Sequence, residues 1–434
     1  MSMRRVAILS VGDELVLGQI DDSNARWLAQ HLQTIGCAPS ERRTVTDDVT
    51  HIARAMRELA ATHFALIVTG GLGPTRDDLT RDALLEVVDQ GGAFVQDADA
   101  IAHLHAWFEG RGRVMPTTNL RQALRPASAR MLANPLGTAP GIAATSASGC
   151  LIFCLPGPPS EMRPMFDACV APLIRDHAHV VLTAALHTVG LGESSIGERL
   201  GSLMARDREP SVGTTASDGI VSVRVRSSGL EADARAALES TINAVREQLG
   251  DIIFGREDET LAAVVGAMLH AKQLTLVTAE SCTGGLIGSM ITDVAGSSAF
   301  YCGGFITYEN ARKTADLGVA VELLELHGAV SHEVAMSMAR GALRVCTADI
   351  AIATTGIAGP SGGSVAKPVG TVYIAIALRG SSVISRRFAI PGDRATVRRR
   401  SALLALASVR TVLLGAPTKI LLWGEAEAPR VEAL

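Results

Sequence analysis

Leu-Thr-Leu-Val-Thr-Ala-Glu-Ser-Cys-Thr-Gly-Gly, residues 274–285, has the pattern of a strand that turns sharply into a helix. The apolar run Leu274 to Val277 predicts the strand, and an amphipathic segment follows the glycines. The turn would place Ser281 and Cys282 beside the free N–H groups of a helix N-terminus, where an anion or an oxyanion is stabilised. Ser and Thr also cap helices. This segment alone therefore predicts either a nucleophilic site or a capped helix.

Strand and helix patterns alternate on both sides of this stretch. In the first part, strands are predicted at 6–11, 43–45 and 64–69, with helices beginning near residues 24, 49 and 78. In the last part, strands are predicted at 274–277, 304–307, 349–355, 370–377 and 383–390, before a long helix from about residue 395. This alternation predicts two α/β domains with mainly parallel sheets flanked by helices. Ligands bind such sheets at the carboxyl ends of the strands.

The middle of the chain has a different pattern. Residues 221–226 alternate between apolar and polar, which predicts a half-exposed strand, and residues 231–249 predict a helix. We therefore expect four segments: an α/β domain at 1–170, a small α+β domain at 171–252, a second α/β domain at 255–415, and a tail at 416–434 with no predicted role.

Composition excludes several classes of protein. The 434 residues are 47% hydrophobic and 19% charged, and no apolar run approaches the roughly 20 residues of a membrane span. The short N-terminal apolar segment does not resemble a secretion signal, so we expect a cytoplasmic protein. Seven cysteines without metal-type spacing predict reduced thiols. A net charge of −4 with 3% aromatic residues argues against direct nucleic-acid binding.

A second glycine cluster follows the strand at 64–69. Gly70, Gly71 and Gly73 lie between this strand and the next helix, which is where a phosphate group would be held. The acidic residues near this loop are Asp13, Asp47, Asp77 and Asp78. Carboxylates beside a phosphate commonly hold a divalent cation. The alternative is that Asp77 and Asp78 cap the helix that follows.

Three sets of motifs together resemble the competence/damage-inducible CinA family. The first set is Gly12-Asp13-Glu14-Leu15 with Leu17-Gly18-Gln19 and Asn24, the run 69–80 from Thr69-Gly70-Gly71, and Leu155-Pro156-Gly157-Pro158 with the four residues after it. The second is the weaker run 190–194. The third comprises 279–285, 295–298, Thr307-Tyr308, Lys313, 356–360, 367–372 and 392–394. The resemblance implies a molybdopterin-biosynthesis-type domain that binds pterin or nucleotide ligands, followed by a nicotinamide mononucleotide deamidase domain, in a homodimer.

The resemblance also implies roles for particular residues of the deamidase domain. Ser281 would be the nucleophile, Tyr308 and Lys313 would handle protons, and no cofactor would be needed. Cys282 is the rival nucleophile, because a thiolate is activated by the same helix terminus. Without the resemblance, Lys313 would be read as a surface lysine and Tyr308 as a core residue. Nucleotide-binding roles are expected for Thr283, Gly284, Gly285, Thr355, Gly356 and Gly359, and phosphate-binding roles for Arg394 and Arg399.

Some members of the family carry a metal-dependent ADP-ribose pyrophosphatase in the first domain. The resemblance implies that this chain shares it, with Asp47 and Asp78 as the acidic pair, Asp13 beside them, and Gly70, Gly71 and Gly73 on the substrate. The expected function is therefore recycling of pyridine nucleotides, with small nucleotide substrates as the partners. The alternative is a nucleotide- or pterin-binding interaction protein that acts in competence or recombination.

Overall fold

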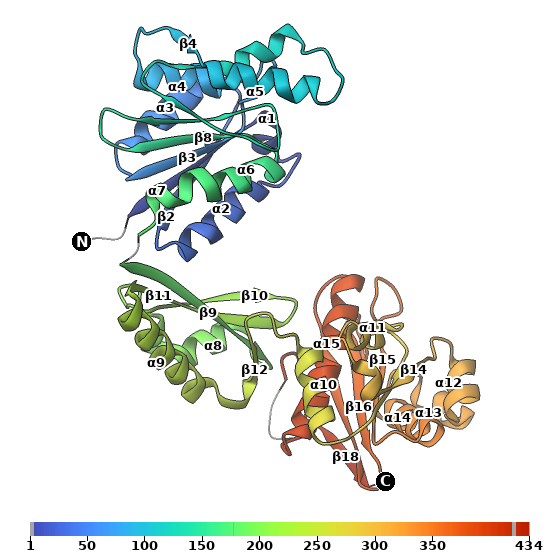
Figure 1. Cartoon of the computed structure of the whole chain (residues 1–434). Coiled ribbons are helices and arrows are strands. Elements are labelled where there is room, and N and C mark those ends of the chain that lie inside the picture. Colours follow the sequence, from blue (N-terminus) through green and yellow to red (C-terminus); the bar gives the residue numbers. More distant parts are fainter. Residues whose placement is uncertain (1–3, 177, 419–421, 434) are drawn as a thin grey trace. The chain divides into compact units, whose positions relative to one another are not determined.

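The computed structural model describes residues 4–176, 178–418 and 422–433. The chain divides into two compact units, one formed by Met1–Leu182 with Ser227–Leu238 and the other by Thr183–Arg226 with Glu239–Leu434. Each unit contains a six-stranded sheet with helices on both faces (Figure 1). The predicted α/β fold class is confirmed.

The first unit is built on a sheet with the strand order β2-β1-β3-β8-β7-β6. The pairs from β2 to β8 are parallel, and β7 and β6 add an antiparallel edge. The strands are β1 (Arg5–Val11), β2 (Ala38–Val45), β3 (Ala65–Thr69), β6 (Arg130–Leu132), β7 (Gly141–Thr145) and β8 (Leu151–Leu155), and β4 (Phe94–Gln96) pairs separately with β5 (Leu124–Pro126). The helices are α1 (Asp13–Val16), α2 (Ser23–Thr34), α3 (Val49–Ala60), α4 (Thr80–Val88), α5 (Ala98–Glu109), α6 (Pro159–Met165) and α7 (Ala171–Ile174).

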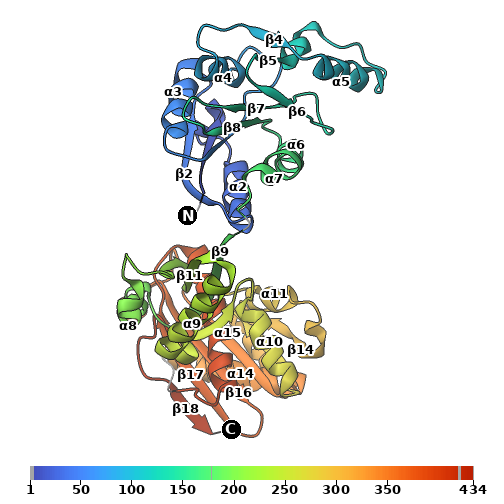
Figure 2. The same cartoon turned by 60° about the vertical axis from the view of Figure 1, so that its left-hand side comes forward.

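The apolar run of β1 explains why this sheet is covered on both faces. Val6 and Ile8 pack with α2 and α6, whereas Ala7 and Leu9 on the opposite face pack with α3 and α4 (Figures 1 and 2). Strands buried on both faces read as continuous rather than alternating apolar runs. The strand ends are therefore left as the accessible part of the sheet.

The middle segment forms a four-stranded sheet in the order β10-β11-β9-β12. Two of its pairs, β10 with β11 and β12 with β9, are antiparallel. Its elements are β9 (His179–Val189), α8 (Glu193–Leu200), β10 (Ser211–Ser217), β11 (Ile220–Leu230), α9 (Glu231–Leu249) and β12 (Ile253–Arg256). The predicted helix at 231–249 coincides with α9.

The last sheet has the order β14-β13-β15-β16-β17-β18. Strand β13 is parallel to both of its neighbours, while β15 to β18 pair antiparallel. The strands are β13 (Leu276–Glu280), β14 (Tyr301–Ile306), β15 (Ile350–Gly356), β16 (Thr371–Leu378), β17 (Ser382–Ala389) and β18 (Arg430–Ala433). The helices are α10 (Leu261–Ala271), α11 (Leu286–Thr292), α12 (Asn310–Leu317), α13 (Val321–His327), α14 (His332–Cys346) and α15 (Arg394–Leu413).

The helices of this part cover opposite faces of the sheet. Helices α10, α11 and α15 share one apolar core, and α14 lies in the core on the other face (Figure 2). Side-chain caps fix where three of them begin: Thr260, Ser331 and Asp393 accept N–H groups in the first turns of α10, α14 and α15. No described helix is long and apolar enough to cross a lipid bilayer.

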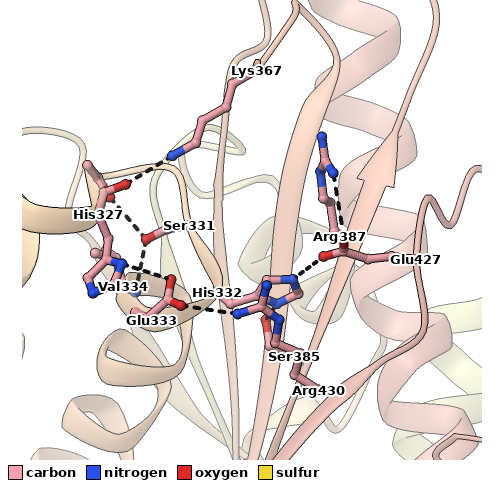
Figure 3. A network of polar contacts seen from close by, with 11 residues as sticks. His327, Ser331, His332, Glu333, Val334, Lys367, Ser385, Arg387, Glu427 and Arg430 are labelled. Carbon is pink, nitrogen blue, oxygen red and sulfur yellow. Dashed lines mark hydrogen bonds and ion pairs between the residues drawn. The ribbon is translucent and has the colours of Figure 1, made fainter.

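The last described part of the tail, residues 422–433, folds back onto this domain and adds β18 to the edge of the sheet. Figure 3 shows the polar contacts that hold it. Glu427 accepts a hydrogen bond from the buried His332 ring at 2.5 Å and lies 3.6 Å from Arg387. Arg430 pairs with Glu333 at 3.2 Å. The tail is thus part of the folded domain, which had not been predicted.

A buried ion pair adds to this attachment. Arg386 on β17 binds both carboxylate oxygens of Glu425, at 2.9 and 2.8 Å. Both side chains are almost fully buried, with 2% and 5% of their surfaces exposed. Burial lowers the pKa of Arg386, and the Glu425 charge opposes this change.

Candidate functional site

The Ser281 turn lies between the end of β13 and the start of α11. Residues 281–285 form the turn, and these five residues separate the end of the strand from the first residue of the helix, Leu286. The Glu280 side chain, 1% exposed, folds back over the turn. Its carboxylate accepts hydrogen bonds from the N–H groups of Gly285 at 2.9 Å, Ile287 at 3.1 Å and Gly288 at 2.9 Å.

These bonds correct two expectations for the turn, the free N–H groups at the helix start and the cap formed by a serine or threonine. The N–H groups at the start of α11 are not free for an anion, because Glu280 already occupies them. Ser281 does not cap the helix either, since the N-cap residue is Gly285 and no side chain caps it in the usual way. Glu280 was not identified from the sequence, and its function in the structure is to hold the shape of the turn.

The turn is held against strand β15 from the other side. Ser281, 8% exposed, donates its N–H to the Thr354 carbonyl at 3.0 Å. The hydroxyls of Thr283 and Thr354 lie 2.8 Å apart, and Arg398 donates to the Thr283 carbonyl at 2.8 Å. The N–H groups of Cys282 and Thr283 make no hydrogen bond to the described residues. Two backbone donors next to Ser281 therefore have no carbonyl partner among the described residues, and both belong to buried residues.

The structure argues against Cys282 as the nucleophile. Its side chain is buried, and this burial raises the pKa of the thiol to about 12. The charges of Lys313 and Arg398 lower the pKa, but they do not offset burial. Because the thiolate is the reactive form, Cys282 stays inert near neutral pH.

Lys313 is a buried lysine and not a surface one. Only 1% of it is exposed, and its ammonium nitrogen donates to the carbonyls of Thr307 at 3.0 Å and Tyr308 at 3.3 Å. Burial lowers its pKa. The N–H of Thr307 donates to the Glu280 carbonyl at 2.8 Å, so the carbonyl that holds Lys313 belongs to a residue bonded to the end of β13, next to Ser281. No described carboxylate forms an ion pair with Lys313, so no acidic side chain offsets the effect of burial on its pKa.

Tyr308 is not a core residue, because 56% of it is exposed. Its hydroxyl accepts a hydrogen bond from Arg394 at 2.6 Å. The same guanidinium donates to the Gly359 carbonyl at 2.9 Å. Arg394 thus links two predicted binding segments that are far apart in the sequence. Its side chain is exposed, so a ligand could replace either of its two hydrogen-bond partners.

The glycine turn after β15 is tightly packed, as expected for a segment that lines one side of a nucleotide site. A side chain at Gly356 would approach the Val372 side chain to 2.7 Å, and Gly359 has the left-handed φ of 80°. Thr355 is buried and donates its hydroxyl to the Ala329 carbonyl at 2.7 Å. Thr355 therefore supports the turn, and its hydroxyl is already used within the protein.

One arginine of α15 that was predicted to bind phosphate points elsewhere, and a different arginine contacts the Ser281 turn. Arg399 pairs with Asp218 of the middle segment at 2.8 Å and is not directed at the Ser281 turn. Arg398, which was not selected, contacts the turn instead. Residues four apart share a face of a helix, so the position of Arg394 could have pointed to Arg398.

A cavity of about 620 Å³ lies at the carboxyl ends of β1 and β3 in the first unit. The three predicted glycines line it, and two are required by the backbone. A side chain at Gly70, with φ 98°, would lie 2.3 Å from the Val11 carbonyl, and one at Gly71 would lie 2.3 Å from the Thr80 hydroxyl. The loop therefore presents bare backbone to the cavity, as a phosphate-binding loop does.

Asp13 and Asp47 hold each other at one side of this cavity. Each carboxylate accepts the other residue's N–H, at 2.9 and 3.2 Å. Burial raises the pKa of Asp47, and the charges of Asp13, Glu14 and Asp77 raise it further. Such crowding of carboxylates is relieved by a cation. Within the described ranges, however, no three His, Cys, Asp or Glu side chains are placed to share a metal ion.

Asp78 stabilises the glycine loop. Its carboxylate accepts the N–H groups of Gly73 at 2.7 Å and Thr75 at 2.8 Å, and also the Thr75 hydroxyl. It does not cap α4, whose N-cap residue is Leu79. The capping alternative for Asp78 was therefore wrong.

Asn24 is a further residue of the cavity whose role had not been predicted. Its amide nitrogen donates to the Gly157 carbonyl at 2.7 Å, while its buried carbonyl oxygen has no partner among the described residues. An unpaired buried acceptor that lines a cavity is suited to a donor group on a ligand.

Family models match all three parts of the chain. A model described as "Probable molybdopterin binding domain" matches residues 7–176, "Damage-inducible protein CinA KH domain" matches 183–255, and "CinA C-terminal domain" matches 258–413. The fold and these matches define a three-part protein with a molybdopterin-binding-type domain, a KH-type middle segment and a CinA C-terminal domain.

The relatives extend this similarity to the whole chain. The "CinA-like protein" of Geobacter sulfurreducens is 44% identical over 417 residues, which cover 95% of this chain and 100% of the relative. That of Gemmatimonas aurantiaca is 40% identical, with coverage of 93% and 95%. The crystal structure of the competence/damage inducible protein CihA from Agrobacterium tumefaciens is 42% identical and covers 36% of this chain and 93% of its own, with a TM-score of 0.35. This chain belongs to the CinA family.

Proposed function

We propose that the C-terminal domain hydrolyses the carboxamide of nicotinamide mononucleotide, giving nicotinate mononucleotide and ammonia in pyridine nucleotide recycling. The observation that carries the proposal is the environment of Lys313. A serine hydroxyl attacks an amide only when a base removes its proton. Lys313 is 1% exposed and held by two carbonyl oxygens. One of these belongs to Thr307, whose N–H bonds to the carbonyl of Glu280, the residue before Ser281.

Those two carbonyls suit a neutral amine. An uncharged lysine has two hydrogens and one lone pair, and the Thr307 and Tyr308 carbonyls use both hydrogens. The lone pair is then free to accept a proton. Burial favours this uncharged form by lowering the lysine pKa. Lys313 would therefore act as the general base toward Ser281 and return the proton to the departing nitrogen.

The turn supplies the remaining requirement, a pair of donors for the oxyanion. Attack of the Ser281 oxygen on the carboxamide carbon moves negative charge to the amide oxygen, which the free N–H groups of Cys282 and Thr283 would stabilise. The C–N bond then breaks and ammonia leaves with the proton from Lys313. Water attacks the resulting ester, which releases the carboxylate and restores Ser281.

Arg394 is our choice for the nucleotide phosphate. A guanidinium binds a phosphate through two parallel hydrogen bonds, and its present contacts, the Tyr308 hydroxyl and the Gly359 carbonyl, are replaceable. Arg398 is engaged by the turn and is assigned a supporting role.

The test is ammonia release from nicotinamide mononucleotide by four proteins: the wild type, Ser281→Ala, Cys282→Ser and Lys313→Arg. We expect activity to fall at least about 1000-fold in Ser281→Ala, which lacks the nucleophile, and in Lys313→Arg, because arginine stays protonated and cannot accept a proton. Cys282→Ser should retain activity. Full activity of Ser281→Ala, with its circular dichroism unchanged, would refute the assignment of the nucleophile.

A second activity is proposed for the first unit, the cation-dependent cleavage of ADP-ribose between its phosphates. The supporting observation is the glycine-loop cavity with Asp13 and Asp47 beside it. Mg²⁺ binds proteins through one or two carboxylates together with substrate phosphates, so this pair fits it even without a third ligand. The ion would neutralise phosphate charge, while the loop backbone would orient the diphosphate.

This activity is tested with Asp47→Asn and, as a matched control, Asp48→Asn, whose carboxylate caps α3 at His51. We expect Asp47→Asn alone to abolish release of AMP from ADP-ribose in the presence of Mg²⁺. Direct binding of Mn²⁺, followed by its paramagnetic signal, should weaken in the same variant. Equal Mn²⁺ binding by Asp47→Asn and wild type would contradict the assignment.

A further inference from the structure

A second cavity, of about 580 Å³, lies within the second unit. The start of α10, the end of α11, one face of α15 and the strands β10 and β11 provide its walls. Its size falls within the range of roughly 300–1,000 Å³ that small-molecule sites occupy. None of the residues proposed for catalysis lines it, so it is a separate site.

The floor of this cavity is apolar and includes an aromatic face. Leu261, Leu406 and Phe254 are buried there. The ring of His187 lies nearly parallel to that of Phe254, with the centroids 5.9 Å apart and an angle of 28° between the planes. Met290 and the half-buried Leu403 extend the surface. This floor suits a flat ring of about one or two fused cycles.

The rim is acidic. Five carboxylates and two guanidinium groups line the cavity. Asp218 is neutralised by Arg399 at 2.8 Å, but Asp258 and Asp293 form no ion pair within the described part of the chain. A lining with excess negative charge above an apolar floor attracts a positively charged ligand and repels an anionic one.

We propose that this cavity binds a small organic cation with a flat aromatic ring. The ring would lie against Phe254 and Leu406, and the positive charge would face Asp258 and Asp293. A free nucleotide, with its phosphates, is the kind of ligand that this rim rejects.

The cavity is physically connected to the Ser281 turn through two helices. Met290 belongs to α11 and Asp293 is the C-cap residue of the same helix, whose first turn is held by Glu280. Leu403 and Leu406 belong to α15, which begins with the arginine that bridges Tyr308 and Gly359. A ligand bound here contacts both helices and should reduce the rate at which α11 opens.

The test uses calorimetric titration of the full chain with 1-methylquinolinium, a permanent cation, and with quinoline, its uncharged analogue at pH 8. We expect one binding site for the cation and at least about tenfold weaker binding of quinoline. The double variant Asp258→Asn/Asp293→Asn should lose at least about fivefold in affinity for the cation only. Asp233→Asn, an exposed position on α9 outside the lining, is the control.

A second variant separates loss of charge from loss of space. Leu403→Trp fills the cavity with an apolar side chain, so it should abolish binding of both compounds without altering the far-ultraviolet circular dichroism. Hydrogen exchange along 286–292 should slow when the cation is bound to the wild type. Equal affinities for the two compounds, or cation binding unchanged in both variants, would overturn the proposal. These readouts do not require amidase activity, so they stand apart from the proposed function.

Discussion

The substitution Glu280→Gln is expected to loosen the Ser281 turn selectively. The buried Glu280 carboxylate accepts three backbone N–H groups, at 2.9, 3.1 and 2.9 Å. Hydrogen bonds to a charged acceptor contribute about 1.5–3 kcal/mol each, against about 1 kcal/mol for neutral ones. Glutamine keeps one acceptor oxygen for two of these groups, and its amide nitrogen would face the N–H of Gly288.

The substitution should therefore lower the free energy that keeps the first turn of α11 closed by about 2–4 kcal/mol. Part of the lost hydrogen-bond energy is offset, because glutamine places no charge in the buried site. The first turn of α11 should therefore open about 30- to 1000-fold more often, since each 1.4 kcal/mol is a factor of ten. Hydrogen exchange of the amides of Gly285, Ile287 and Gly288, measured at residue level, reports this opening directly. Glu325→Gln, at an exposed position on α13, is the matched control.

Two outcomes would refute this reasoning. Exchange rates within about twofold of the wild type at all three amides would show that the carboxylate contributes little. Equal acceleration in the whole sheet would show a global loss of stability and not a local one. If the proposed amidase is correct, kcat should fall with the local opening, because the two free N–H groups belong to the same turn.

Native protein treated with iodoacetamide at pH 8 should be alkylated at the exposed Cys302 and not at Cys282, whose pKa is raised to about 12; modification of Cys282 before unfolding would contradict its burial. Arg386→Met should cost about 3–5 kcal/mol in urea unfolding because it breaks a buried ion pair, whereas Arg387→Met should cost less than about 1 kcal/mol. Amidase kcat/KM should rise with pH through an apparent pKa below lysine's ordinary 10.5, since burial lowers the Lys313 pKa and the base must be unprotonated; a flat profile would exclude it.

Most elements of the fold could be predicted because their signals are local. The helix 231–249 and the strand cores at 6–11 and 349–355 follow from residue period alone. The antiparallel half of the last sheet was not predicted, because periodicity does not show which way a neighbouring strand runs. The three residues between β16 and β17 were an available signal, since parallel strands need a much longer connection.

The site could be predicted only in part for a similar reason. Ser281, Tyr308 and Lys313 lie in recognisable motifs. Glu280 acts through a hydrogen bond from its side chain to the N–H of a residue seven positions later in the chain, which the sequence pattern does not show. Arg399 was predicted in place of Arg398, because a run of consecutive arginines does not itself show which side chain reaches the turn. The burial of Lys313 depends on packing around α12, which no local pattern specifies.

The strand β18 has a consequence for behaviour at high concentration. Without it, Ser382–Ser385 of β17 would offer unpaired backbone groups to any other extended chain, a common start of aggregation. With β18 present, the last strand of the sheet consists of four exposed residues, and two of these, Arg430 and Glu432, are charged. A short, charged last strand is a poor template for further strands. Residues 430–433 therefore remove Ser382–Ser385 as a site for strand addition by another chain.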